Sequence, residues 1–359
     1  MFKKKKSEIT VLSLVLAGSL LLSACNVAET DVSSNSAPID PQNCEIEEGN
    51  LRVYLNPWGA TLTDEFTADT GIGVDLADLG GGEILARIAA EANNPQWDVV
   101  VLDGHGSLEG LRQSGQLYEN PPVQNVSSLD SEGQSLLPEN DAWIPISKHA
   151  AAIIAYNVDA VNDGDVPKTW EDLLSSKLAP VGIADPAIAA PAYPVVSWFF
   201  EDRGDAEAKE YFETLKKNGL NTYEKNGPVG NAVATGAVKT AMMQEQHLFE
   251  MIDDGEPIDF VWPEEGAPAA VRAAAISADT PRPCAAAALI DWMLDSENMT
   301  YLMEEGGDDG IITPFVEGTD TSSLPASRPE DAKLNITDAE YAADHESEIK
   351  DWFANLQLQ

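Results

Sequence analysis

Residues 98–106, Asp-Val-Val-Val-Leu-Asp-Gly-His-Gly, place four large apolar residues directly before an acidic, glycine-rich turn. An uninterrupted apolar run of this kind is typical of a strand that is buried on both faces, as in a parallel sheet. The Asp-Gly-His-Gly that follows is a turn signal. The stretch therefore predicts a parallel strand over 98–102 whose carboxyl end carries polar side chains.

Strand and helix patterns alternate around this stretch. Residues 51–55 and 71–77 have the apolar alternation of strands. Between them, 61–68 has helical spacing, and Gly80-Gly81-Gly82 opens a further helix with one apolar face. Alternating strands and helices predict an α/β fold with a parallel sheet.

The second half of the chain repeats the alternation. Strands are expected over 181–184, 238–243 and 258–262, and helices from Asp205 onward and over 284–294. The repeated pattern extends the α/β prediction to the whole chain.

A last helix is expected near the end of the chain. Thr337 and Glu340 have the spacing of a capping box, which marks a helix start. An apolar stripe predicted to pack against the body of the protein follows at Ile349, Trp352, Phe353 and Leu356.

The first 25 residues have the order of an export signal. A basic patch at Lys3–Lys6 precedes an apolar run at Val11–Leu22, which is too short to cross a bilayer core of about 30 Å as a helix. The ending Leu22-Ser23-Ala24-Cys25 resembles a bacterial lipobox. We therefore expect a lipoprotein signal peptide over 1–24, lipidation of Cys25, and an exported protein anchored to the cell membrane. Residues 25–49, rich in Ser, Asn, Asp and Pro, are expected to form a flexible tether.

The charge balance excludes several partners. The chain has 21 Lys and Arg against 61 Asp and Glu, for a formal net charge of −40. Such a surface repels nucleic acid and anionic lipid headgroups, so the lipid anchor would have to hold the protein at the membrane. The even spread of carboxylates favours adaptation to salt.

Two cysteines remain after Cys25. An exported protein meets oxidising conditions, so Cys44 and Cys284 are expected to form a disulfide, with two buried thiols as the alternative. The chain has no CxxC pair and only four histidines, so neither a metal site nor a cofactor is predicted.

Polar residues recur where predicted strands end. Carboxyl ends of parallel strands meet at one edge of a sheet, where helix N-termini offer free N–H groups to a ligand. No GxSxG, P-loop or HExxH motif is present, which argues against an enzyme. The candidate ligand-binding residues at these ends are Asn56, Trp58, Gly81, Gly82, Glu83, Asp103, His105, Asp185, Gly227, Glu245 and Glu264, and Tyr156 and Tyr193 join them.

Several segments together resemble the extracellular solute-binding proteins of ABC transporters, in the branch with ferric-iron, polyamine, thiamine and phosphonate binders. The resemblance covers roughly residues 50–315 and is carried by 82–88 (Gly-Glu-Ile-Leu-Ala-Arg-Ile), 98–100, 154–157 (Ile-Ala-Tyr-Asn), 167–174 (Pro-Lys-Thr-Trp-Glu-Asp-Leu-Leu) and 263–266 (Pro-Glu-Glu-Gly).

The resemblance implies a type II periplasmic-binding-protein fold. Its two α/β lobes would be 50–149 plus 271–359 and 150–270, joined by a hinge and closing on a small solute. A membrane permease would then recognise the closed form.

Two segments differ from the family members that bind iron and phosphonate, and these differences bear on the ligand class. Residues 242–247 lack the adjacent tyrosines of the ferric members, and 187–192 lack the hydroxyl donors usual in phosphonate binders. Carboxylates at strand ends, with the aromatic rings of Trp58, Tyr156 and Tyr193, favour an organic cation such as a polyamine. Iron or phosphonate binding by the same fold, recognition of another protein by a surface lipoprotein, and a secreted enzyme are the alternatives.

Overall fold

The computed structural model describes residues 39–329 and 331–358. The predicted signal peptide, Cys25 and the first part of the predicted tether lie outside these residues. No helix in the described part of the chain combines the length and apolarity that crossing a membrane requires.

The first sheet contains the stretch from which the fold was predicted. That stretch forms β3 (Val99–Asp103), which is buried throughout and pairs in parallel with β1 (Leu51–Leu55). The strand order is β11-β4-β10-β3-β1-β2, and β12 pairs with β10. The remaining strands are β2 (Val74–Asp78), β4 (Trp143–Ala150), β10 (Ala267–Ile276), β11 (Thr313–Pro314) and β12 (Leu334–Asn335).

The second sheet takes all of its strands from the middle of the chain, in the order β7-β6-β8-β5-β9. The chain leaves the first sheet at Ala150, enters the second at Ile153, and returns to the first at Ala267. The strands are β5 (Ile153–Asn157), β6 (Val181–Ala184), β7 (Leu220–Tyr223), β8 (Thr240–Met243) and β9 (Ile258–Val261).

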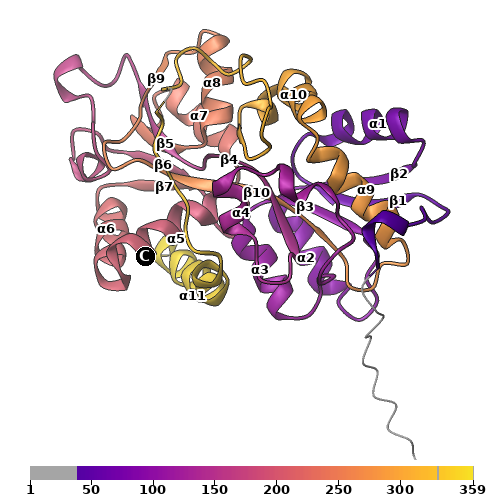
Figure 1. Ribbon diagram of the computed structural model, residues 1–359. Helices are drawn as coiled ribbons and strands as arrows, with labels where there is room; N and C mark the ends of the chain where they lie inside the picture. Colours follow the sequence, from indigo (N-terminus) through magenta and orange to yellow (C-terminus); the bar gives the residue numbers. More distant parts are fainter. Residues whose placement is uncertain (1–38, 330, 359) are drawn as a thin grey trace, which may run out of the picture. The chain divides into compact units, whose positions relative to one another are not determined.

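Helices accompany both sheets, as the alternation predicts (Figure 1). We call the first sheet with its helices the first lobe and the second sheet with its helices the second lobe. The first lobe has α1 (Gly59–Thr70), α2 (Gly81–Ala90), α3 (His105–Gln113), α4 (Ser131–Leu136), α9 (Pro283–Met293) and α10 (Ser296–Glu305). The second has α5 (Ala192–Arg203), α6 (Asp205–Lys217), α7 (Asn226–Ala234) and α8 (Glu245–Asp253). Short 3₁₀ helices are η1 (Pro41–Asn43), η2 (Asn125–Ser128), η3 (Asp163–Asp165), η4 (Glu171–Leu174) and η5 (Gly307–Gly310).

The C-terminal helix α11 (Ala339–Gln357) contacts both lobes. It packs against α3 of the first lobe and against α5 and α6 of the second (Figure 1). Ile349, Phe353 and Leu356 are buried in the aromatic core that also holds Phe212. This confirms the predicted apolar stripe, although the helix joins the two lobes rather than belonging to the first alone.

The start of α11 differs from the prediction. Asp338, not Thr337, is the N-cap, and its side chain accepts a hydrogen bond from the N–H of Tyr341 at 2.9 Å. Thr337 is buried instead, and its carbonyl oxygen accepts a hydrogen bond from Nε2 of His105 at 2.9 Å. The adjacent aspartate takes the capping role because its carboxylate stays at the surface and is a strong N-cap acceptor.

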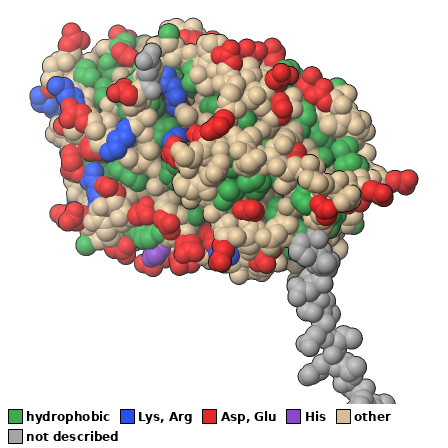
Figure 2. All heavy atoms as spheres, in the orientation of Figure 1, with side chains coloured by type: hydrophobic (Ala, Val, Ile, Leu, Met, Phe, Trp, Pro, Cys, Tyr) green, Lys and Arg blue, Asp and Glu red, His purple; other side chains and the backbone are tan. Residues whose placement is uncertain are grey.

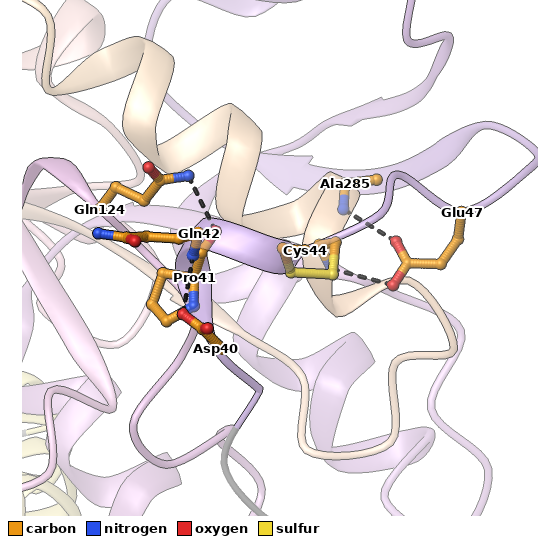
Figure 3. Close-up of a disulfide and its surroundings, with 8 residues drawn as sticks. Asp40, Pro41, Gln42, Cys44, Glu47, Gln124 and Ala285 are labelled. Carbon is orange, nitrogen blue, oxygen red and sulfur yellow. Dashed lines mark hydrogen bonds between the residues drawn. A yellow bond between two sulfur atoms is a disulfide. The ribbon is translucent and has the colours of Figure 1, made fainter.

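A disulfide between Cys44 and Cys284, with a Cα–Cα distance of 5.4 Å, ties the first described residues to α9 (Figure 3). The Glu47 carboxylate accepts hydrogen bonds from the N–H groups of Cys284 (3.1 Å) and Ala285 (2.9 Å), and so caps this helix. Because of these contacts the chain is held on the first lobe from Asp40 onward, before residue 49, where the predicted tether ends.

Acidic side chains are dispersed over the surface. Figure 2 shows Asp and Glu scattered across one face, with Lys and Arg gathered mainly toward one side of it. Adaptation to salt remains a prediction.

Candidate ligand-binding site

A polar cavity of about 420 Å³ lies between the two lobes. The first lobe contributes the carboxyl ends of β1, β2 and β3, the start of α2, and η5. The second lobe contributes the segment before α5 and the starts of α7 and α8. The lining residues are Asn56, Asp78, Leu79, Gly80, Gly81, Glu83, Asp103, Ile188, Ala189, Ala190, Pro191, Lys225, Asn226, Gln244, Gln246, His247, Asp308 and Asp309.

The lobes touch beside the cavity at two glycines of α2. A Cβ added to Gly81 would lie 2.2 Å from the Cβ of Ala190, and one added to Gly82 would lie 2.7 Å from the carbonyl oxygen of Ile188. Both distances are shorter than real Cβ atoms tolerate. The two positions therefore require glycine because the second lobe approaches the backbone here, and only Gly81 lines the cavity.

Arg272, fully buried on β10, holds two carboxylates at the first-lobe wall. Its Nε donates to Oδ1 of Asp103 at 2.7 Å, and its Nη2 donates to Oδ1 of Asp309 at 3.3 Å. Its Nη1 also donates to the backbone carbonyl oxygen of Asp309 at 2.8 Å. Burial raises the pKa of Asp103, but the charge and hydrogen bonds of Arg272 lower that pKa overall. Burial raises the pKa of Asp309, against the charge of Arg272.

Two further carboxylates of this wall are exposed. Asp78 ends β2, and Glu83 lies in the first turn of α2. Oε2 of Glu83 accepts a hydrogen bond from the N–H of Gly80 at 3.0 Å, which fixes its place beside the cavity. These two groups give the first-lobe wall negative charge that a solute can reach.

The second-lobe wall is built from amide side chains at helix starts. Nδ2 of Asn226 donates to Oε1 of Gln244 at 3.0 Å, and Nε2 of Gln244 donates to Oε1 of Gln246. Nε2 of Gln246 is buried and has no hydrogen-bond partner in the described part of the chain. A buried donor without a partner is costly, so the chain of amides ends in a group that is not satisfied within the described residues.

His149 supports this wall from β4. Its Nε2 accepts a hydrogen bond from Nε2 of Gln244 at 3.0 Å. Burial lowers the pKa of His149 to about 4, so the ring is neutral near pH 7. The neutral ring is what allows Nε2 to act as an acceptor.

Of the residues expected from the sequence, the structure brings Asn56, Gly81, Glu83 and Asp103 together around this cavity. All four come from strand ends or the helix start that follows one. Their convergence at one sheet edge is the geometry on which the expectation rested.

The three aromatic candidates lie elsewhere. The ring of Trp58 is covered by the Arg272 guanidinium, whose Cζ is 4.3 Å from its centroid. The hydroxyl of Tyr156 donates to Asp259 (3.0 Å), and that of Tyr193 donates to the carbonyl oxygen of Ala342 (2.5 Å). None of the three lines the cavity.

Glu245 and His105 are engaged within the protein. The Glu245 carboxylate accepts hydrogen bonds from the N–H of Ala150 (2.6 Å) and from Nε of Arg328 (2.7 Å), where the chain crosses between lobes. Burial raises the pKa of Glu245. His105 is buried against Thr337.

The last three candidates also lie outside the lining. Asp185 caps the turn after β6 by accepting from the N–H of Ala187 at 2.8 Å. Glu264 is exposed in the segment leading to β10. Gly227, expected in a separate turn with Pro228, lies in the first turn of α7, where proline is tolerated because its missing N–H would have no helical partner.

Sequence reasoning missed eight of the eleven polar side chains that line the cavity. Asp78 directly follows the strand predicted over 71–77, so the rule that polar residues at strand ends line the site could have found it. The others lie at helix starts of the second lobe or in η5, whose orientation toward the first sheet no local pattern reveals. The missed polar residues are Asp78, Lys225, Asn226, Gln244, Gln246, His247, Asp308 and Asp309.

Two α/β lobes around a polar cavity are the architecture of the type II periplasmic-binding-protein fold, and a solved structure supports this fold. The periplasmic binding protein AfuA from Actinobacillus pleuropneumoniae, with fructose-6-phosphate bound, superimposes with a TM-score of 0.77 at 19% identity, over 87% of this chain and 100% of that one.

The chain belongs to the bacterial extracellular solute-binding protein family, whose model matches residues 61–330. It is thus an exported solute-binding protein of the ABC-importer class, and several of its relatives are named as periplasmic binding proteins.

Three relatives illustrate the similarity, and the two whose names give a solute differ in that solute. An uncharacterised protein of Haemophilus influenzae is 25% identical, over 87% of this chain and 92% of its own length. A putative 2-aminoethylphosphonate-binding periplasmic protein of Salmonella typhi is 24% identical, over 58% of this chain and 59% of its own. The spermidine/putrescine-binding periplasmic protein of Escherichia coli is 26% identical, over 68% and 71%.

Proposed function

We propose that this protein captures a small solute bearing at least one ammonium group between its lobes and delivers it to an ABC permease. The observation that carries this proposal is the excess of carboxylates around the cavity. Five line it, at Asp78, Glu83, Asp103, Asp308 and Asp309, whereas Lys225 and His247 are the basic residues in the lining.

Two carboxylates of the lining remain unpaired after the ion pairs within the described part of the protein are counted. Arg272 is shared between Asp103 and Asp309, and His247 faces Asp308 with Nδ1 3.2 Å from Oδ2. Asp78 and Glu83 remain exposed at the cavity. An ammonium group placed there would form charge-assisted hydrogen bonds, which are the stronger kind.

The cavity favours hydrogen bonding over stacking. None of its lining residues is aromatic, so the cation–π part of the sequence hypothesis has no support. A compact, polar amine fits this wall better than one with a large apolar part.

A second group on the solute is favoured by Gln246. Its buried Nε2 has no acceptor among the residues that the structure describes. It lies at the start of α8, where backbone N–H groups and the helix dipole attract negative charge. Lys225 adds a cation to the same wall. A zwitterion with its ammonium at the first lobe and its acidic group at the second is therefore the alternative to a simple amine.

The proposed mechanism is capture without chemistry. A solute that contacts both walls binds the closed arrangement better than an open one, and so shifts the equilibrium toward closure. The close approach at Gly81 and Gly82 supports this, since the lobes fit together only when the backbone is bare. Lipidation of Cys25 would keep the protein near its permease, and loss of membrane attachment in Cys25→Ser would test the anchor.

The test is thermal unfolding of the chain without its first 25 residues; the cores and the disulfide lie wholly within the part retained. The panel contains diamines, polyamines, aminophosphonates, amino acids, phosphonates, sugar phosphates and Fe³⁺, in the presence of a chelator for all but the metal. A ligand that binds only the folded state raises the melting temperature.

Stabilisation by amines or zwitterions supports the proposal. Stabilisation confined to phosphonates, sugar phosphates or iron would overturn the solute class. No shift with any solute would favour the surface lipoprotein that recognises another protein.

A further inference from the structure

His247, Glu250 and Asp308 form a cluster where the second lobe meets the first. His247 and Glu250 lie three residues apart on α8 and share one helix face, and Asp308 lies in η5. Nδ1 of His247 is 3.2 Å from Oδ2 of Asp308 and 4.0 Å from Oε2 of Glu250. One nitrogen and two carboxylate oxygens, contributed by both lobes, lie within 4.8 Å of one another.

The spacing suits a tetrahedral ion. Zn²⁺ binds imidazole nitrogen and carboxylate oxygen at about 2.0–2.2 Å, which puts neighbouring ligand atoms roughly 3.3–3.6 Å apart. The observed separations bracket that value, so small side-chain rotations would complete three ligands. A water would fill the fourth position, as in other zinc sites with three protein ligands.

The cluster also has charge that a cation would neutralise. Two of its three side chains, Glu250 and Asp308, are carboxylates.

We propose that His247, Glu250 and Asp308 bind a divalent transition-metal ion of the Zn²⁺ type, which joins α8 to η5 beside the solute cavity. His247 and Asp308 also line that cavity, so the ion would hold the lobes together around the solute. This second consequence rests on the proposed lobe closure, whereas the metal site does not.

The test is calorimetric titration of Zn²⁺ into the chain without its first 25 residues, with no solute present. We expect one ion per chain and a higher melting temperature. In many metal sites, removing a residue that only hydrogen-bonds to a ligand lowers the metal affinity 10–100-fold. Removing a ligand itself, in His247→Ala or Asp308→Asn, should therefore weaken Zn²⁺ binding at least about tenfold. His345→Ala on α11 and Glu305→Gln near η5 are matched controls, and they should bind as the wild type does.

Unfolding of each variant in chelator separates lost binding from lost folding. Absence of Zn²⁺ binding by the wild type, or undiminished binding by folded His247→Ala and Asp308→Asn, would overturn the metal site. If the variants lose Zn²⁺ but a stabilising solute binds equally well with and without the ion, the metal does not lock the lobes. The solutes are tested in the presence of chelator. If none of them stabilises the protein, the proposed function fails, but the result of the Zn²⁺ titration is unaffected.

Discussion

The two walls of the cavity hold their polar groups differently. At the first-lobe wall, the buried Arg272 donates hydrogen bonds to the carboxylates of Asp103 and Asp309, so the negative charge is placed before any solute arrives. At the second-lobe wall, Asn226, Gln244 and Gln246 form a chain of neutral amides, which ends in a donor without a partner in the described part of the chain. We infer that the first wall selects the charge of the solute and the second selects its hydrogen-bonding pattern.

The largest expected effect comes from removing the fixed cation of the first wall. Arg272→Met leaves the carboxylates of Asp103 and Asp309 without their buried partner, and breaking a buried ion pair in this way costs about 3–5 kcal/mol. Urea unfolding measures the loss. The double variant Arg272→Met/Asp103→Asn should recover part of it. Equal stability of Arg272→Met and the wild type would show that the first wall is not held by this pair.

The support of the second wall predicts a pH dependence. The pKa of His149 is lowered to about 4 by burial, against 6.5 in the unfolded chain, so between these values the unfolded state binds the additional proton. Stability therefore falls as pH falls from about 6.5 to 4, by roughly 3 kcal/mol at most from this residue.

The measurement compares unfolding free energies at several pH values for the wild type and His149→Asn. The slope between pH 6.5 and 4 should be shallower in the variant, with His345→Gln as the control that keeps the wild-type slope. Parallel profiles for His149→Asn and the wild type would mean that His149 is not the group that titrates.

The contact between the walls can be broken without touching a polar group. Gly81→Ala places a Cβ against Ala190 and should prevent full closure, which weakens solute binding by about 10- to 100-fold, or 1.4–2.8 kcal/mol. Gly110→Ala on α3, whose Cβ would meet nothing within 4 Å, is the control. Unchanged affinity for the stabilising solute in Gly81→Ala would argue against closure at this point.

The smallest expected effect concerns an exposed charge of the first wall. Asp78→Asn keeps the shape and removes the charge, and should weaken binding of an amine about two- to fivefold, since exposed ion pairs contribute up to about 1 kcal/mol. Asp253→Asn, an exposed carboxylate of α8, is the control for the change in net charge. A uniform loss in both variants would assign the effect to long-range attraction rather than to the wall.

The fold was largely predictable because its signals are local. The apolar run of β3 and the alternation around it predicted an α/β fold, which the structure confirms. The N-cap of α11 was misplaced by one residue, because Thr337 and Asp338 are both capping residues and only the tertiary contact of Thr337 with His105 separates them.

The site was predictable only where it depends on strand ends. Asn56 and Asp103 follow parallel strands, so sheet topology brings them together. Trp58 comes from such an end as well, but its ring is covered by Arg272, a residue of β10 that reaches it through antiparallel pairing with β3. Gln246 lies on the second lobe and faces the first wall only through the arrangement of the lobes, on which local sequence patterns carry no information.

A crystal structure of the chain with the amine or zwitterion that stabilises it most tests the central claim directly. We expect the ammonium group within hydrogen-bonding distance of Asp78 or Glu83, and a solute acceptor at Nε2 of Gln246. A solute bound outside this cavity, or an ammonium group directed at Lys225 and the second wall, would contradict the account.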